Sequence, residues 1–247
     1  MKYAIGGALA AVIIGSRALA QTPAGAEKPL TANDIMQKTL AAYSAAKTYQ
    51  GSWSYVLEQG DGPTHQMQKM LLEIKSKSPT KLLFTVAPAP GQKPVPGGQA
   101  LPELRVVVDG KTAYFENTTE KSYYKVTLPK NAAISPLMFL PIIPSISGVD
   151  RKEDITADGK TLYSLAANTT DGGIGRMEIE TGTFHIKRLT TEALLGLSKS
   201  ISTMTVDKET YDADIPDSTF SYKATKGAKE MEAPPTAAVM FGPPDKK

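Results

Sequence analysis

The sequence predicts an α+β fold, in which one curved antiparallel sheet is plugged by an N-terminal helix and a short apolar helical lid. Two observations support this prediction. Most of the chain consists of short segments in which apolar and polar residues alternate, and this pattern is typical of half-buried antiparallel strands. A helical period occurs only near the N-terminus, and an uncharged segment with three prolines, residues 134–149, interrupts the strands.

The predicted helix covers residues 32–47. Thr31 is suited to cap its first turn, and Asp34, three positions later, can bond back to it in a capping box. Apolar residues at positions 35, 36, 40 and 43 form one stripe, and the alanines around them favour the helical state. This stripe predicts that the helix lies on the sheet.

About ten strands follow, nearly all joined by short turns, so the sheet should be antiparallel and sequential. The Asp109-Gly110 pair, for example, predicts a tight type I′ hairpin turn. A sheet of this width curls, or closes in part, around whatever covers its inner face. The expected strands are residues 50–59, 65–77, 81–86, 104–108, 112–116, 121–128, 161–167, 175–180, 183–189 and 198–211.

Residues 134–149 cannot form a central strand, because proline lacks the N–H that the strand ladder needs. The segment is also too short and too often interrupted to span a membrane. Pro136 fits the first turn of a short helix. We expect this segment to cover the concave side of the sheet as a plug or lid.

The first 20 residues have the pattern of a secretory signal peptide. Lys2 supplies a positive charge, an apolar run follows, and Ala18-Leu19-Ala20 fits the cleavage site, so the mature protein would begin at Gln21. The chain contains no cysteine, which excludes disulfides and thiol catalysis. We expect an exported protein, soluble after cleavage, in the periplasm or an equivalent compartment.

Composition also predicts the domain boundaries. Residues 21–30 form a disordered leader, residues 31–224 a single domain, and residues 225–247 a disordered tail rich in lysine and proline. Within the domain, residues 87–103 contain five prolines and three glycines. This stretch is either an insertion in a hairpin or a flap over a ligand mouth.

No catalytic or metal-binding pattern occurs. The two histidines, His65 and His185, are far apart, lie in predicted strands and are expected to be solvated. Asp212 and Asp214 precede Pro216, which favours a role in a turn. The formal net charge of +3 is small for 247 residues and gives no reason to expect nucleic acid as a partner. We therefore expect neither an enzyme nor a bound cofactor or metal.

The order of these features resembles that of the periplasmic lipoprotein carrier superfamily (LolA/LolB-like), and of its exported relatives in particular. The resemblance implies an unclosed antiparallel half β-barrel whose helices plug a hydrophobic cavity that accepts acyl chains. It spans roughly residues 31–230 and rests on Ser52-Trp53-Ser54-Tyr55, Lys77-Ser78-Pro79, the strand at 81–86, Val106 to Tyr114, Ile215 to Tyr222 and Lys226-Gly227-Ala228.

One position departs from the carrier pattern. In the carriers an arginine directly before the proline of the second meander turn helps to hold the lid shut. Ser78 occupies that position here, with Lys77 one residue earlier. A lysine does not replace a bidentate guanidinium.

The resemblance and the strand pattern together predict a monomeric binding protein that holds a lipid or lipoprotein acyl chain. The alternative is an envelope interaction or sensor module with a filled core and no lipid, which would act on other envelope proteins through its strand edges, its 87–103 loop or its tail. The residues expected to line the cavity and lid are Trp53, Tyr55, Leu72, Phe84, Val106, Phe115, Leu137, Phe139 and Ile142.

Overall fold

The computed structural model describes residues 29–60, 65–77, 79–92, 103–130, 132, 134–139, 146–169, 173–195 and 198–233. The expected signal peptide and residue Ile142 lie outside this part of the chain. The helical elements described are α1 (Ala32–Ala45) and two 3-10 helices, η2 (Pro136–Phe139) and η4 (Asp217–Phe220). The strands are β1 (Thr48–Gln59), β2 (Gln66–Lys77), β3 (Lys81–Pro88), β4 (Leu104–Asp109), β5 (Thr112–Asn117), β6 (Ser122–Thr127), β7 (Ile146–Arg151), β8 (Ile155–Ala157), β9 (Lys160–Thr169), β10 (Ile174–Glu180), β11 (Ile186–Leu195), β12 (Ser198–Tyr211) and β13 (Lys229–Glu230).

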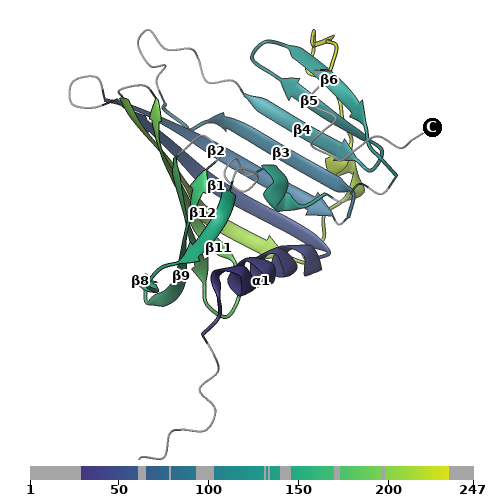
Figure 1. Ribbon diagram of the computed structural model, residues 1–247. Coiled ribbons are helices and arrows are strands. Elements are labelled where there is room, and N and C mark those ends of the chain that lie inside the picture. The colour runs from purple at the N-terminus through teal and green to yellow at the C-terminus, as the bar shows by residue number, and fades with distance from the viewer. Residues whose placement is uncertain are drawn as a thin grey trace, which may run out of the picture.

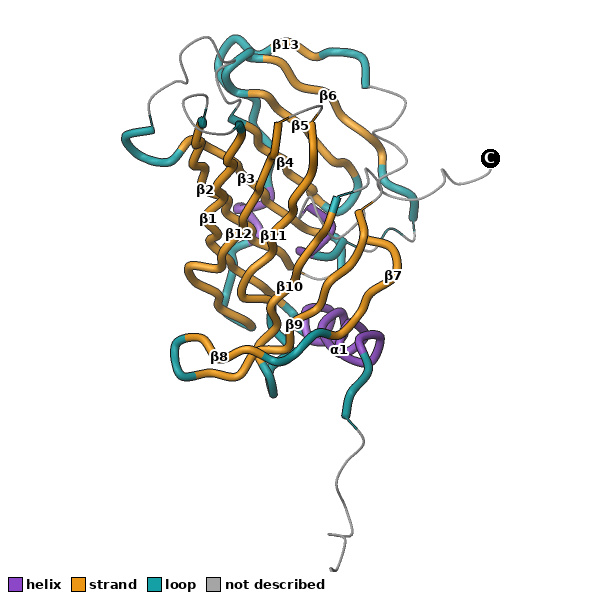
Figure 2. Tube along the Cα trace, turned by 60° about the vertical axis from the view of Figure 1, so that its left-hand side comes forward, coloured by secondary structure: helices purple, strands orange, loops and turns teal. Residues whose placement is uncertain are grey.

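All of these strands belong to one curved and unclosed sheet. Its order is β13-β6-β5-β4-β3-β2-β1-β12-β11-β10-β9-β7, with β8 paired to β9, and every pairing except β13 with β6 is antiparallel. Figure 1 shows the sheet bent into two wings that meet at β1 and β12, with α1 and η2 on the concave side. The view in Figure 2 shows that β7 and β13 remain at separate edges. The predicted half-barrel fold class is confirmed.

The two wings join through the long antiparallel pair β1–β12. This pairing connects the first strand of the chain to the last long one, from Tyr49 with Tyr211 to Gln59 with Ser200. The register shifts between Ser52 and Trp53, and such a bulge bends and twists a strand locally. The bulge therefore lies at the place where the two wings diverge.

Helix α1 begins as predicted, with both halves of the capping box formed. The Asp34 N–H donates to Thr31 Oγ1 at 3.1 Å, and the Thr31 N–H donates to Asp34 Oδ2 at 2.9 Å. The buried residues Ile35, Thr39 and Tyr43 lie on the face turned to the sheet. The helix ends at Ala45, two residues before the predicted end.

The hairpin predicted at Asp109-Gly110 joins β4 to β5. The Asp109 carboxylate accepts the N–H groups of Lys111 and Thr112, each at 2.9 Å. Gly110 has a φ of 105°, which a glycine adopts without a side-chain penalty. Asp109 does not have a positive φ, so the turn is not the predicted type I′.

Strands β7 and β13 replace parts of the predicted lid and tail. Residues Ile146–Val149, expected in the lid, belong to β7, which pairs with β9. Residues Lys229–Glu230, expected in the tail, form β13 and pair with β6. Both pairings are non-local, so neither was visible in the local composition. Within the lid segment, η2 confirms a short helical turn at Pro136, and residues 140–145 lie outside the described part.

The segment after β12 folds back over the outer face of β3–β6. There the Glu116 side chain is fully buried, and it forms an ion pair with Arg105. The Thr225 N–H donates to Glu116 Oε1 at 2.7 Å, and the Tyr222 ring stacks on Tyr114 with centroids 4.2 Å apart. Burial alone would raise the pKa of Glu116, but the hydrogen bonds from Thr225 and Arg105 hold it below its ordinary value. The charged carboxylate therefore holds the C-terminal segment against the outer face of the sheet.

Replacing Glu116 by glutamine should lower the free energy of unfolding by about 1–3 kcal/mol at neutral pH, because hydrogen bonds to a charged group are lost at a buried site. Chemical denaturation measures this change. Glu73→Gln is the matched control, since Glu73 is exposed on β2, and its effect should stay within about 0.5 kcal/mol. Equal effects of the two variants would contradict the role assigned to Glu116.

Candidate functional site

An apolar row crosses the concave face of the first wing. Cross-strand pairing aligns Ile74 with Phe84, Phe84 with Val106, Val106 with Phe115, and Phe115 with Tyr124. Ile74, Phe84 and Val106 are buried, whereas Phe115 and Tyr124 are half-buried. Burial thus decreases from the centre of the sheet toward the β6 edge.

The outer end of this row borders a small groove of about 180 Å³. The rings of Phe115 and Tyr124 stack there, with centroids 4.8 Å apart. Met231, which follows β13, is 58% exposed, and its N–H donates to Tyr123 O at 2.7 Å. The groove is lined by Leu104, Arg105, Val106, Phe115, Glu116, Asn117, Ser122, Tyr123, Tyr124 and Met231.

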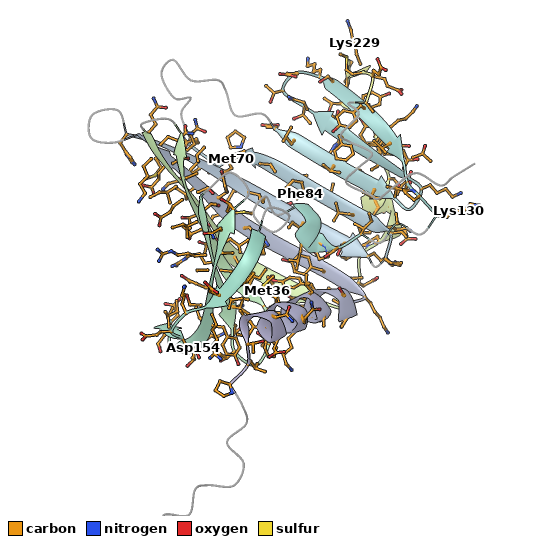
Figure 3. All side chains as sticks on the ribbon, viewed as in Figure 1. Met36, Met70, Phe84, Lys130, Asp154 and Lys229 are labelled. Carbon is orange, nitrogen blue, oxygen red and sulfur yellow. The ribbon has the colours of Figure 1, made fainter. Side chains whose placement is uncertain are left out.

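Helix α1 and the η2 segment cover the centre of the concave face. Ile35 and Tyr43 from α1, and Ile134 and Leu137 from the lid segment, belong to one buried cluster with the sheet. In Figure 3, Met70 and Phe84 extend from the sheet on the side where η2 and α1 lie, and Met36 is on α1. Among the described residues, α1 and η2 therefore cover the centre of the concave face, and the side chains near β6 are less completely buried.

The predicted cavity residues whose side chains the structure describes divide into two groups. Five are buried in the single core cluster: Trp53, Leu72, Phe84, Val106 and Leu137. Tyr55 and Phe115 are half-buried at the margin of that cluster. Phe139 belongs to η2, but its side chain, like all of Ile142, lies outside the described part of the structure.

Of the ten groove residues, only Val106 and Phe115 are among the predicted cavity residues; the eight others include Leu104, Tyr124 and Met231. The alternation along residues 122–127 places Tyr124 on the same face as Phe115, so strand period was a usable signal for Tyr124. No local signal predicted Met231, because its position depends on the parallel pairing of β13.

A cluster of polar side chains holds α1 against the β1–β12 pair, which is the seam where the two wings join. Tyr43 and Tyr49 each donate their hydroxyl hydrogen to Glu209 Oε1 at 2.9 Å. The Trp53 Nε1–H donates to the Tyr49 hydroxyl at 3.0 Å, and the Ile186 N–H donates to that of Tyr43 at 3.2 Å. Burial, followed by the charge of Glu209, raises the pKa of both tyrosines far above the ordinary value, so both stay protonated donors.

Gly51 makes room for this arrangement. It pairs with Glu209 across the seam, and the Tyr49 ring lies over it. A Cβ atom at position 51 would lie 2.1 Å from the Tyr49 hydroxyl oxygen. The absent side chain therefore lets Tyr49 reach the Glu209 carboxylate.

His185 does not occupy the solvated strand position that was predicted. It lies in the turn between β10 and β11, where its ring stacks on Tyr211 with centroids 4.2 Å apart. The preceding residue, Phe184, has a φ of 59°, which is unusual for a bulky side chain. Burial lowers the pKa of His185, in opposition to the attraction of Glu209, while Lys187 lowers it further.

The other polar residues considered in the sequence make contacts with neighbouring residues of the fold. Asp212 accepts the Lys47 N–H at 2.8 Å, in agreement with a role in a turn. His65 is exposed and lies 3.2 Å from Glu58. Lys77, one residue before the position of the carriers' arginine, forms an ion pair of 2.7 Å with Asp217 of η4.

Neither a metal site nor a membrane-spanning helix occurs in the described part of the chain. The described residues contain no group of three or more histidine, aspartate or glutamate residues placed to hold a metal ion. Within the same ranges, no helix is both long and apolar enough to cross a membrane.

The stability of the protein should fall as the pH drops from 7 toward 5. The folded-state pKa of His185 is lowered, so the unfolded chain binds a proton more readily, and the stability difference grows as the pH falls below about 6.5. In His185→Gln this part of the pH dependence should vanish. Urea denaturation at pH 7 and pH 5 measures it, and the exposed His65→Gln variant, which should keep the wild-type slope, is the control. An unchanged slope in His185→Gln would contradict this assignment.

Comparisons with known proteins cover both sequence and structure. No protein-family model and no curated protein matches the sequence. Among solved structures, the chain is similar to an uncharacterized conserved protein from Thermus thermophilus, with a TM-score of 0.48 and 10% identity over 81% of this chain and 98% of that one. It is also similar to a LolA superfamily protein from Nitrosomonas europaea (TM-score 0.35, 10% identity, 78% and 98% covered) and to LprF from Mycobacterium bovis (TM-score 0.40, 12% identity, 78% and 97% covered). At these identities the similarity is one of fold alone.

Proposed function

We propose that this protein is an exported binding protein that holds a lipid or a lipoprotein acyl chain on the concave face of its sheet. The observation that supports it best is the apolar row whose burial decreases toward the β6 edge. Its outer members, Phe115 and Tyr124, keep exposed apolar surface beside the groove. Burying each methylene group of a guest would contribute about 0.8 kcal/mol, without any polar chemistry.

The groove would take one end of such a chain. Its volume of about 180 Å³ is below the roughly 300–1,000 Å³ of pockets for drug-sized ligands, but an acyl chain is narrow. Tyr55, at the margin of the core cluster, would contact the inner part of the chain, and Phe115 the part in the groove. Entry or release of the chain would require the η2 segment, which packs through Leu137, to move.

The export, domain bounds and monomeric state that we propose are those predicted from the sequence. Residues 1–20 would direct export to the periplasm and be removed, and residues 31–224 would form the binding domain as a monomer. A binding role is favoured over an enzymatic one because the described polar clusters serve structural contacts, as at Glu116 and Glu209.

The second candidate is an envelope interaction or sensor module with a filled core. It is favoured by the burial of Trp53, Leu72 and Phe84, which leaves the centre of the concave face packed by protein. Native mass spectrometry of the protein purified from a periplasmic extract separates the two candidates. A folded protein that carries no lipid, and that leaves fluorescent fatty-acid probes unbound, would favour the filled module.

The side chains of Leu104 and Leu71 allow a matched test of the lipid proposal. Both are 39% exposed in strands, but Leu104 lines the groove, whereas Leu71 alternates with the core-facing Met70 and Leu72 and lies on the outer face. Leu104→Asp should weaken binding of a fluorescent fatty acid by about tenfold or more, because a carboxylate would have to be desolvated beside the chain. Leu71→Asp should leave binding within about twofold. Equal losses, or no loss in Leu104→Asp, would contradict the groove as the binding site.

A further inference from the structure

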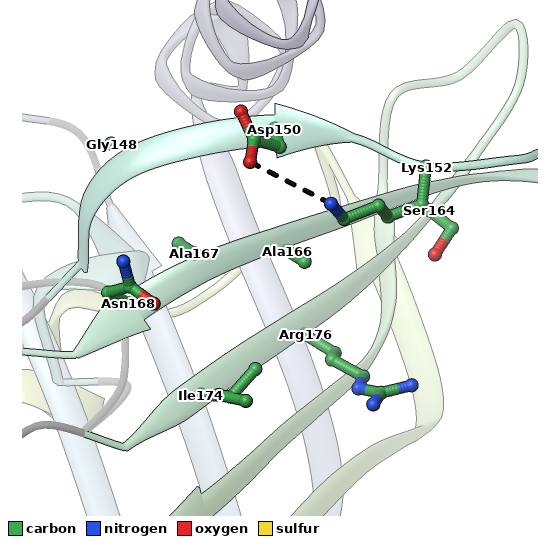
Figure 4. A pocket seen from close by; sticks show the side chains of 9 residues that line it. All are labelled: Gly148, Asp150, Lys152, Ser164, Ala166, Ala167, Asn168, Ile174 and Arg176. Carbon is green, nitrogen blue, oxygen red and sulfur yellow. Dashed lines mark ion pairs between the residues drawn. The ribbon is translucent and has the colours of Figure 1, made fainter.

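A second groove lies on the opposite, outer face of the sheet, over β9. It has a volume of about 460 Å³, within the usual range of small-molecule pockets. Figure 4 shows its floor on β9, with side chains of β7 and β10 on either side. The lining residues are Gly148, Asp150, Lys152, Ser164, Ala166, Ala167, Asn168, Ile174 and Arg176.

The groove exists because β9 presents small side chains between two strands that carry long ones. In the central row, Ala166 pairs with Asp150 of β7 on one side and with Arg176 of β10 on the other. Neighbouring strands are about 4.8 Å apart, so Asp150 and Arg176 start about 10 Å from each other with only a methyl group between them. Ser164 extends the small-residue floor in one direction along β9.

The Arg176 guanidinium has no ion-pair partner among the residues that the structure describes. Its cross-strand neighbours are Ala166 and Thr190, which carry no charge. The nearby carboxylate of Glu178 is 3.6 Å from Arg188 instead. Five N–H donors in a planar fork therefore border the groove without a carboxylate to bind.

A second cation borders the same floor. Lys152 lies beside Asp150, with 3.7 Å between their charged atoms, and both side chains are largely exposed. Such a long, exposed ion pair contributes little and can open at small cost. With Arg176 and Lys152 against Asp150, the groove carries a net positive charge.

We propose that this groove binds a small oxyanion-bearing ligand, with the carboxylate or phosphate group held between the Arg176 guanidinium and the Lys152 ammonium above Ala166. The guanidinium fork matches either group with two parallel hydrogen bonds. The small floor lets the anion approach both cations, and Ile174, which is exposed at one end, contacts the rest of the ligand.

The charge of Asp150 lets the sign of the ligand's charge be tested through the change in affinity when Asp150 is replaced. Asp150 competes with the ligand for Lys152 and repels an anion, so Asp150→Asn should tighten the binding of the anion. A ligand held by its positive group would bind more weakly to the same variant. Tightening therefore supports the oxyanion, and weakening overturns it.

The test is a titration of the full chain at low ionic strength, with succinate in one arm and inorganic phosphate in the other. Backbone amide NMR shifts monitor the binding. Saturable shifts of β7, β9 and β10 amides are expected with at least one of them, and the effective arm identifies the carboxylate or the phosphate. Arg176→Gln should weaken binding about tenfold or more. Ala166→Leu, which keeps every charge but fills the floor, should do the same.

Arg188→Gln is the matched control, because Arg188 lies on the neighbouring strand and is already paired with Glu178. It should leave the affinity within about twofold. Shifts of equal size with sodium chloride, no saturable shift in either arm, or equal losses in Arg176→Gln and Arg188→Gln would overturn the proposal. The Leu104→Asp variant should bind the anion normally, so this test is independent of the lipid proposal.

Discussion

The fold depends on the contact that Glu209 makes at the seam between β1 and β12. One carboxylate oxygen accepts the hydroxyl groups of Tyr43 and Tyr49. It thereby links helix α1, the first strand and the last long strand, which are up to 166 positions apart in sequence. A buried carboxylate with hydrogen-bond donors is tolerated, whereas one without them would be costly. This single group therefore holds the helix at the pair of strands where the two wings join.

Local patterns in the sequence predicted the bounds of strands and the start of the helix, because neighbouring residues determine these features. The alternation in residues 65–77 and 198–211 predicted β2 and β12 almost to the residue, and Thr31 with Asp34 predicted the start of α1. The partners of the strands were not predictable in this way. The β1–β12 pairing and the parallel β13–β6 pairing join segments more than 100 positions apart, so no turn residue marks them. The half-buried place of His185 likewise depends on Tyr211, a residue from another strand.

The candidate site was predicted in part for the same reason. Strand period assigns residues such as Phe84 and Phe115 to the concave face, but it does not say which of them something else covers. Helix α1 has 14 residues and is about 21 Å long, while the sheet path of twelve strands is about 50 Å wide. Among the described residues, one helix and one 3-10 turn cover the central rows. The rows near β6 are less completely buried, which is why the proposed guest is placed there.

Successive side chains of a strand point to opposite faces of the sheet, so the two faces carry different residues and different chemistry. On β9, Leu165 belongs to the core cluster, and Ser164 and Ala166 line the outer groove. Small residues on the outward face make a polar groove, because their neighbours on β7 and β10 are charged. Large residues on the inward face of β3–β6 make an apolar one. A ligand bound in either groove would contact the same strand ladder, yet the two grooves share no side chain. The two proposed ligands would therefore not compete for space or charge.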